Sequence, residues 1–251
     1  MIESLLGVLI SLALLIWSCD FAIKNSILVS HVYKIRPILV GIFIIAIGTS
    51  LPEFAATFQA LKLNSVGIVA GNLVGSNIAN ILLVGGIMLY PISMLVTDKR
   101  DKSTFLFFLI FSIIFFIFII FNFNIGYIYG ALLFGLLCFF IYFELKKPID
   151  ESNTISEITH SSSFFIILKI ILGFIALFFS SKYFIVYAKD LTSIFGVAET
   201  TIGITIVAFG TSLPEVIATI LSIAKKQNNL AIGNILGSNI ANIFGITIIA
   251  V

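Results

Sequence analysis

Two short segments carry carboxylate and hydroxyl side chains inside long apolar stretches of the chain. The string GTSLPE occupies residues 48–53 and returns at residues 210–215. A carboxylate inside a segment apolar enough to cross a membrane is energetically costly, so it predicts a functional site. We expect Glu53 and Glu215 to be functional rather than members of a structural ion pair, because no basic residue lies at matching depth.

Other oxygen-bearing residues share a helix face with each glutamate, and the next apolar segment carries a second polar stripe. Both stripes occur twice. In the first copy the glutamate stripe is Ala46, Thr49 and Glu53 and the second stripe is Asn72, Ser76 and Asn80. In the second copy they are Ala208, Thr211 and Glu215, and Asn234, Ser238 and Asn242. Together they offer carboxylate, hydroxyl and amide oxygens and no thiolate or imidazole ligand. Hard cations such as Na⁺ and Ca²⁺ bind oxygen ligands of this kind. The sequence therefore predicts a cation site to which both copies contribute.

A proline directly precedes each glutamate. Pro52 and Pro214 lie inside expected helices, where a proline removes one backbone hydrogen bond and clashes with the carbonyl four residues back. Those carbonyls belong to Gly48 and Gly210. We expect the interruption to free backbone carbonyl oxygens that face a cavity, where they can bind a cation.

The composition indicates which elements hold these residues. Of 251 residues, 60% are hydrophobic and 10% are charged, against roughly 25% charged in soluble domains. Several apolar stretches exceed the roughly 18–20 residues that span a bilayer, and segments that cross a bilayer fold as helices or closed barrels. We predict an all-α polytopic membrane protein, with a loop or short interfacial helix at 24–37 and eight spans at 4–23, 38–61, 66–90, 103–121, 125–143, 163–187, 200–223 and 228–251.

The two halves of the chain are copies of one unit. A shift of 162 residues aligns 41–81 with 203–243, and 21 of these 41 positions are identical. The first unit has five spans, so the second enters the membrane in the opposite orientation, an arrangement typical of transporters with a site at the midplane. We divide the chain into a first membrane repeat (1–143), a cytoplasmic linker (144–162) and a second membrane repeat (163–251). The second repeat lacks counterparts of 90–143, so we expect a ten-span protein of which this chain is a part.

Lysine and arginine residues predict the orientation. With the N-terminus outside, ten of them fall in inside loops and two in outside loops, as the positive-inside rule requires. We expect a multi-pass protein of the cell membrane, the inner or plasma membrane, with its N-terminus outside. The lipid bilayer is its expected partner. The net charge of +2 is too small to indicate nucleic-acid binding, and no obligatory protein partner is implied.

The paired GTSLPE and GNxxGSNIAN motifs resemble the two repeats of the sodium/calcium exchanger family, within the cation/Ca²⁺ antiporter superfamily. The resemblance covers essentially the whole chain, and the short linker resembles the prokaryotic form. It implies a secondary active antiporter, not an enzyme, that exchanges Na⁺ for Ca²⁺ by alternating access without a cofactor. It also implies oxygen ligands from Glu53, Glu215, Thr49, Thr211, Ser50, Ser212, Ser76, Ser238, Asn80 and Asn242, and carbonyl oxygens from Ala46 and Ala208.

One feature departs from the family pattern. Many members have an acidic residue at one of the positions of Asn80 and Asn242, and this chain has asparagine at both. Two carboxylates balance one Ca²⁺ or two Na⁺, so we expect the stoichiometry, the K⁺ dependence or the ion pair to differ from the best-known members. Coupling to K⁺ or H⁺ stays open, as do three alternatives: a divalent cation/H⁺ antiporter on the same scaffold, a cation channel and a non-transporting scaffold.

Small and polar residues beside the motifs predict packing rather than ion binding. Small residues at 71, 75 and 79 and at 233, 237 and 241 predict close helix packing. Asn77 and Asn239 lie off the polar stripe and predict hydrogen bonds between helices. Asp20 lies one turn from Lys24 near the end of the first span, which predicts a structural or interfacial role.

Overall fold

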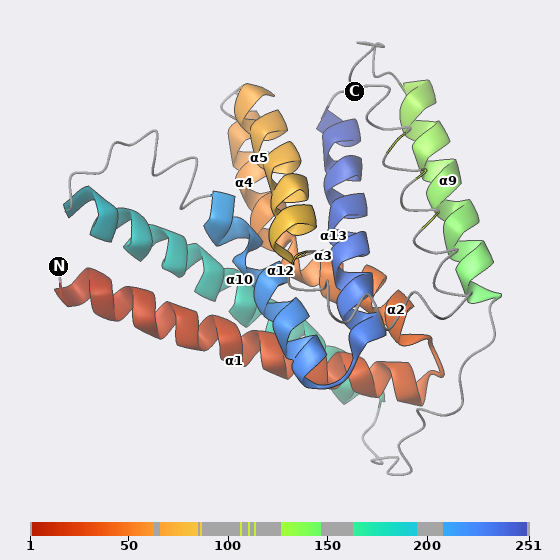
Figure 1. Ribbon diagram of the computed structural model, residues 1–251, viewed down its shortest axis with the longest axis horizontal. Coiled ribbons are helices and arrows are strands. Elements are labelled where there is room, and N and C mark those ends of the chain that lie inside the picture. Colours follow the sequence, from red (N-terminus) through yellow and green to blue (C-terminus); the bar gives the residue numbers. More distant parts are fainter. Residues whose placement is uncertain are drawn as a thin grey trace.

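The structure is a computed structural model that describes residues 2–62, 66–84, 86, 106, 110, 113, 127–146, 163–194 and 208–249. Every element in these ranges is helical, which confirms the all-α prediction. Figure 1 shows the elements: α1 (Ile2–Val32), α2 (Pro37–Val40), the π-helical turn η1 (Gly41–Ile45), α3 (Ala46–Thr49), α4 (Leu51–Lys62), α5 (Val66–Ala79), the π-helical turn η2 (Asn80–Val84), α9 (Tyr127–Leu145), α10 (Ser163–Ile194), α12 (Ala208–Ala224) and α13 (Asn228–Ile249).

The two longest helices, α1 and α10, lie side by side (Figure 1). Gly7 of α1 packs on Tyr187, and Gly173 of α10 packs on Ala22, so the helices run antiparallel. The first helices of two oppositely oriented repeats are expected to run in this way. Each helix is long and apolar enough to cross a membrane, and the bent pair formed by residues 37–49 and 51–59 makes a third such span within the described residues.

The mixed segment at 24–37 does not form a separate element, so the prediction for it is wrong. Helix α1 continues to Val32, and the chain turns over residues 33–36 before α2 begins at Pro37. Two of its buried polar side chains bond to nearby backbone: Asn25 donates to the carbonyl of Phe21 at 2.7 Å, and Ser30 donates to the carbonyl of Ile35 at 2.7 Å. Polar residues satisfied in this way lie in the core without ending the helix.

The contact between α13 and the α2–η1 segment depends on glycine. A Cβ atom at Gly233 would lie 2.2 Å from the carbonyl oxygen of Ile38, and one at Gly237 would lie 2.5 Å from that of Ile42. The prediction of close packing is confirmed for this copy. It is not confirmed for Gly71 and Gly75, because a Cβ at either position would meet no described atom within 4 Å.

Two apolar clusters hold α12 and α13, the helices that carry the second copies of the motifs. The larger one joins α1, α10 and α12, and the smaller one joins α2, η1, α9 and α13 through residues such as Ile38, Phe140 and Ile240. The second motif copies are therefore packed between other helices. The predicted span at 103–121 and most of the linker fall outside the described residues, and the division into three parts stays a prediction.

Candidate cation site

The first GTSLPE copy interrupts a helix. Helix α3 ends at Thr49 and α4 begins at Leu51, with a bend of 43° between the two segments. Pro52 has no N–H group to donate to the carbonyl of Gly48, and the π-helical turn η1 precedes the break by one helical turn. The predicted interruption is confirmed here. It is not seen at the second copy, where α12 runs through Pro214 as a helix from Ala208 onward.

Hydrogen bonds join the two copies of the motif. The Ser50 hydroxyl donates to Oε1 of Glu215 at 2.9 Å, and the Thr49 hydroxyl lies 3.2 Å from Oδ1 of Asn234. All four side chains are buried. Residues more than 160 positions apart thus meet in one buried polar cluster, as the repeat pattern predicts.

Unpaired buried oxygens concentrate in the same cluster. Within the described residues, neither carboxylate oxygen of Glu53 has a hydrogen bond of normal geometry, although the Ser212 hydroxyl lies nearby, and Oε2 of Glu215 has none either. Further unpaired side-chain oxygens belong to predicted site residues, namely Ser76, Ser212, Ser238, Asn80 and Asn242. Buried polar atoms are nearly always paired, and an unpaired buried carboxylate is especially costly. A bound cation would satisfy these oxygens.

The structure places every predicted ligand in the core, apart from Ala208, whose side chain is not described. Thr211 is buried like the others. The carbonyl of Ala46 already accepts from the N–H of Ser50 at 3.0 Å, and it lies 3.2 Å from the Thr49 hydroxyl, whose single hydrogen it shares with Oδ1 of Asn234. It would have to release one of these contacts to bind a cation. Within the described residues no three His, Cys, Asp or Glu side chains gather into a metal site, so the cluster contains two carboxylates and otherwise neutral oxygens.

The family follows from comparison with known proteins. The family model described as sodium/calcium exchanger protein matches residues 3–146 and 165–251 of this chain. The chain belongs to the sodium/calcium exchanger family.

Several relatives of this exchanger cover most of it. It is 33% identical to a putative antiporter, CaxA, of Alkalimonas amylolytica, over 98% of this chain and 79% of the relative. It is 31% identical to an uncharacterized membrane protein of Methanocaldococcus jannaschii (94% and 78%) and 28% identical to the sodium/calcium exchanger MaX1 of Methanosarcina acetivorans (94% and 79%). A solved structure of the sodium-calcium exchanger NCX_Mj superposes with a TM-score of 0.80 at 28% identity, covering 100% of this chain and 82% of that one. The resemblance inferred from the motifs is confirmed.

Two asparagines act differently from the sequence prediction. The sequence places Asn72 and Asn234 in stripes that offer oxygen, but in the structure the amide N–H of each donates a hydrogen bond of 3.2 Å to the backbone carbonyl of a site glutamate. Each amide also donates to a threonine hydroxyl, which belongs to Thr57 in the first repeat and to Thr219 in the second. Sequence reasoning did not single out these threonines. The signal that could have found them is that both repeats have threonine at this equivalent position.

The two asparagines that lie off the polar stripe, Asn77 and Asn239, make different hydrogen bonds. Asn77 accepts a hydrogen bond of 3.1 Å from Nδ2 of Asn242, which confirms a bond between helices of different repeats. Asn239 instead donates to the carbonyl of Ile235 on its own helix at 2.9 Å. The amide of Asn242 is thereby oriented, with its nitrogen held by Asn77 and its oxygen left unpaired within the described residues.

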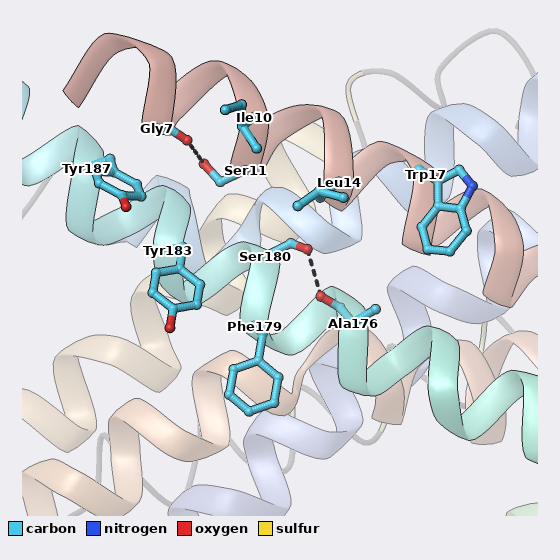
Figure 2. A pocket seen from close by; sticks show the side chains of 10 residues that line it. All are labelled: Gly7, Ile10, Ser11, Leu14, Trp17, Ala176, Phe179, Ser180, Tyr183 and Tyr187. Carbon is cyan, nitrogen blue, oxygen red and sulfur yellow. Dashed lines mark hydrogen bonds between the residues drawn. The ribbon is translucent and has the colours of Figure 1, made fainter. Parts of the chain in front are cut away.

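The groove between α1 and α10 is unsuited to ions. Its volume is about 440 Å³, and Figure 2 shows its lining, which includes Leu14, Trp17 and Tyr183. Its serine hydroxyls bond to their own helices: Ser11 donates to the carbonyl of Gly7 and Ser180 to that of Ala176, both at 2.6 Å. These hydroxyls are already satisfied, and the remaining lining is largely apolar. The buried cluster between the repeats, with its unpaired oxygens, is therefore the better candidate for a cation site.

Proposed function

We propose that this exchanger couples Na⁺ movement to Ca²⁺ movement in opposite directions, through one site formed by both repeats. The observation that carries the proposal is the cluster of unpaired buried oxygens around Glu53 and Glu215, joined across the repeats by the bond from Ser50 to Glu215. Membership of the family supports it, as does the likeness to MaX1 and NCX_Mj, which are both named as sodium/calcium exchangers.

The ligands of this site would be the buried oxygens of both motifs. The two glutamates supply the negative charge, and the neutral oxygens come from Thr49, Thr211, Ser50, Ser212, Ser76, Ser238, Asn80 and Asn242, with carbonyls of Ala46 and Ala208. Na⁺ and Ca²⁺ both prefer oxygen ligands. They would compete for the same atoms, so that binding of one ion displaces the other.

The charge of the site explains why exchange would be obligatory. The carboxylates of Glu53 and Glu215 are buried, and their negative charges repel each other. Moving the unoccupied site through a low-dielectric barrier costs several kcal/mol or more per uncompensated charge. One Ca²⁺ or two Na⁺ neutralise the pair. The loaded protein would therefore change conformation readily, and the ion-free protein would do so rarely.

The bonds between the repeats suggest how the two conformations differ. Ser50 donates a full hydrogen bond to Glu215, whereas the counterparts after the 162-residue shift, Ser212 and Glu53, lie near each other without a hydrogen bond of normal geometry within the described residues. Inverted repeats provide alternating access when one repeat moves against the other. In the opposite-facing state, the bond from Ser212 to Glu53 would form and the bond from Ser50 to Glu215 would open.

A pair of asparagines shows the same asymmetry. Asn242 donates to Asn77, but in the counterpart pair the Nδ2 atom of Asn80 and the Oδ1 atom of Asn239 have no partner in the described part of the chain. These groups would pair when Asn77 and Asn242 separate. Two independent bonds thus support one exchange of partners between the repeats.

The proposed orientation has the N-terminus outside the cell. Asp20 pairs with Lys24 and with Lys225, each at 2.6 Å, which fits the expected structural or interfacial role of Asp20. The two lysines lie in different repeats and were both expected on the inside. Their contact with one carboxylate means that they lie at the same end of the helices. This agreement supports the placement of both lysines on one side of the membrane, and the positive-inside rule alone assigns that side to the inside.

Uptake of radioactive Ca²⁺ by proteoliposomes that contain the full-length protein tests the function. An outward Na⁺ gradient is expected to drive uptake, whereas a pH gradient or a K⁺ gradient alone is not. Uptake driven by a pH gradient without Na⁺ would instead assign a divalent cation/H⁺ antiporter. Flux that needs no counter-ion and does not saturate would indicate a channel.

A further inference from the structure

In both repeats an asparagine side chain links two helices through two hydrogen bonds, and we call this pair of bonds the tether. In the first repeat, the amide nitrogen of Asn72 on α5 donates to the Glu53 carbonyl at 3.2 Å and to the Thr57 hydroxyl at 3.1 Å, both on α4. In the second repeat, Asn234 on α13 donates to the Glu215 carbonyl and to the Thr219 hydroxyl, both at 3.2 Å and both on α12.

The asparagine of each tether bonds to the partner helix at two points one turn apart. The two acceptors are four residues apart, so they lie above one another on one helix face. An NH₂ group has two hydrogens, and here each has its own acceptor. A helix held at two points on one face cannot rotate about its axis without breaking a bond. The direction in which the glutamate side chain leaves the helix is fixed by the same contact.

The tether lies next to a helical turn that lacks one backbone hydrogen bond. Pro52 and Pro214 directly precede the two glutamates, and a proline removes one backbone hydrogen bond from its turn. The Asn72 and Asn234 amides bind in the next turn and add a bond from a neighbouring helix. This stabilises the backbone beside the weakened turn.

Asn234 also connects the repeats. Its Oδ1 atom lies 3.2 Å from the hydroxyl of Thr49, while its nitrogen holds the backbone of Glu215. Asn234 is completely buried, and the contacts use both of its hydrogens and its oxygen. Its amide oxygen faces Thr49, and its nitrogen has the wrong polarity to bind a cation.

We propose that Asn72 and Asn234 are positioning residues, which set the direction of Glu53 and Glu215 through the backbone and do not themselves bind the ion. The inference rests on the proposed function, because it takes the two glutamates as the ion-binding groups. Thr57 and Thr219 complete the tether as acceptors. The first consequence of losing a tether is a weaker ion affinity rather than a lower maximal rate.

The Asn234→Asp substitution separates a positioning role from a ligand role. Aspartate keeps a side-chain oxygen and the size of asparagine, but it has no hydrogens for the Glu215 carbonyl and the Thr219 hydroxyl. We expect the Ca²⁺ concentration for half-maximal uptake by full-length protein in proteoliposomes to rise by about tenfold, as for the loss of a buried hydrogen bond. A ligand would behave in the opposite way, because the added charge would hold or tighten Ca²⁺ binding.

A double-mutant cycle gives a second readout. Thr219→Val removes the acceptor with little change in shape, and its effect on the half-maximal Ca²⁺ concentration should not add to that of Asn234→Leu, because both break one tether. Thr219→Ser keeps the hydroxyl and should restore the wild-type value. Full additivity, or no rescue by serine, would overturn the proposal.

Thermal stability with and without Ca²⁺ separates positioning from a purely structural role. We expect the variants to lose much of the Ca²⁺-induced rise in melting temperature; a lower melting temperature with an unchanged Ca²⁺ response would contradict the proposal. Asn25→Asp is the matched control, since within the described residues Asn25 bonds only to the carbonyl of Phe21 on its own helix. The ion affinity of this variant should stay at the wild-type value. If the wild-type protein itself shows no Na⁺-driven uptake, the proposed function fails rather than the tether.

Discussion

The hydroxyl of Ser50 donates a hydrogen bond of 2.9 Å to the carboxylate of Glu215, a residue of the other repeat. The equivalent residues Ser212 and Glu53 lie near each other, but no hydrogen bond of normal geometry joins them within the described residues. The difference between two otherwise identical motif copies gives a direct test of alternating access.

Removing either serine hydroxyl should change the balance between the two facing states in opposite directions. Ser50→Ala takes away a bond made in the present conformation, so it should favour the opposite-facing state, and Ser212→Ala should do the reverse. Each lost bond is worth about 1 kcal/mol, or roughly a fivefold shift. Sided cysteine-accessibility or fluorescence measurements of the two states in liposomes would show it. Equal shifts in one direction would contradict the exchange of partners.

Neutralising either glutamate should abolish transport without unfolding the protein. Glu53→Gln and Glu215→Gln each remove half of the negative charge, so Na⁺-driven Ca²⁺ flux should fall to background. In ion-free buffer their melting temperature should stay level or rise, because an unpaired buried carboxylate destabilises the fold. Glu3→Gln, at an exposed position near the N-terminus, is the matched control and should transport normally. Retained flux in either glutamate variant would refute the site.

An added carboxylate should alter the coupling ratio. With two carboxylates and asparagine at positions 80 and 242, we expect wild-type exchange to carry no third Na⁺ for each Ca²⁺. Asn80→Asp should be better tolerated than Asn242→Asp, because the Asn242 nitrogen is bonded to Asn77 and an aspartate there would face the Asn77 oxygen. The reversal potential of Ca²⁺ flux in liposomes measures the ratio. Electrogenic exchange of three Na⁺ per Ca²⁺ by the wild-type protein would disprove this hypothesis.

Alanine in place of glycine at two positions of α13 should show that this helix is closely packed. Gly233→Ala and Gly237→Ala place a Cβ against the backbone of Ile38 and Ile42, and overpacking of this kind costs about 1–3 kcal/mol. Gly71→Ala meets no described atom within 4 Å and should leave stability unchanged or raise it slightly, since alanine favours helix. Thermal denaturation in detergent compares the three variants. A similar loss in all of them would show that α5 is packed as closely as α13.

The sequence was informative where a pattern repeats with the helical period. The stripes that contain Glu53 and Ser76 and their counterparts were identified because periodicity and duplication both point to one face. Buried polar residues such as Asn25 were misread as signs of a loop, since composition does not show that a side chain bonds to its own helix. The direction of the Asn234 amide and the spacing around Gly71 were not predictable either. Both depend on which helix lies opposite, and this is set by the tertiary packing.

The central claim is that Na⁺ and Ca²⁺ compete for one site that needs both Glu53 and Glu215. Equilibrium binding of radioactive Ca²⁺ to the purified full-length protein, titrated with Na⁺, tests it directly. We predict that Na⁺ displaces Ca²⁺ with a cooperative dependence, because more than one Na⁺ replaces each Ca²⁺, and that either glutamine variant alone eliminates Ca²⁺ binding. Binding that is insensitive to Na⁺, or that survives the loss of one glutamate, would contradict the account.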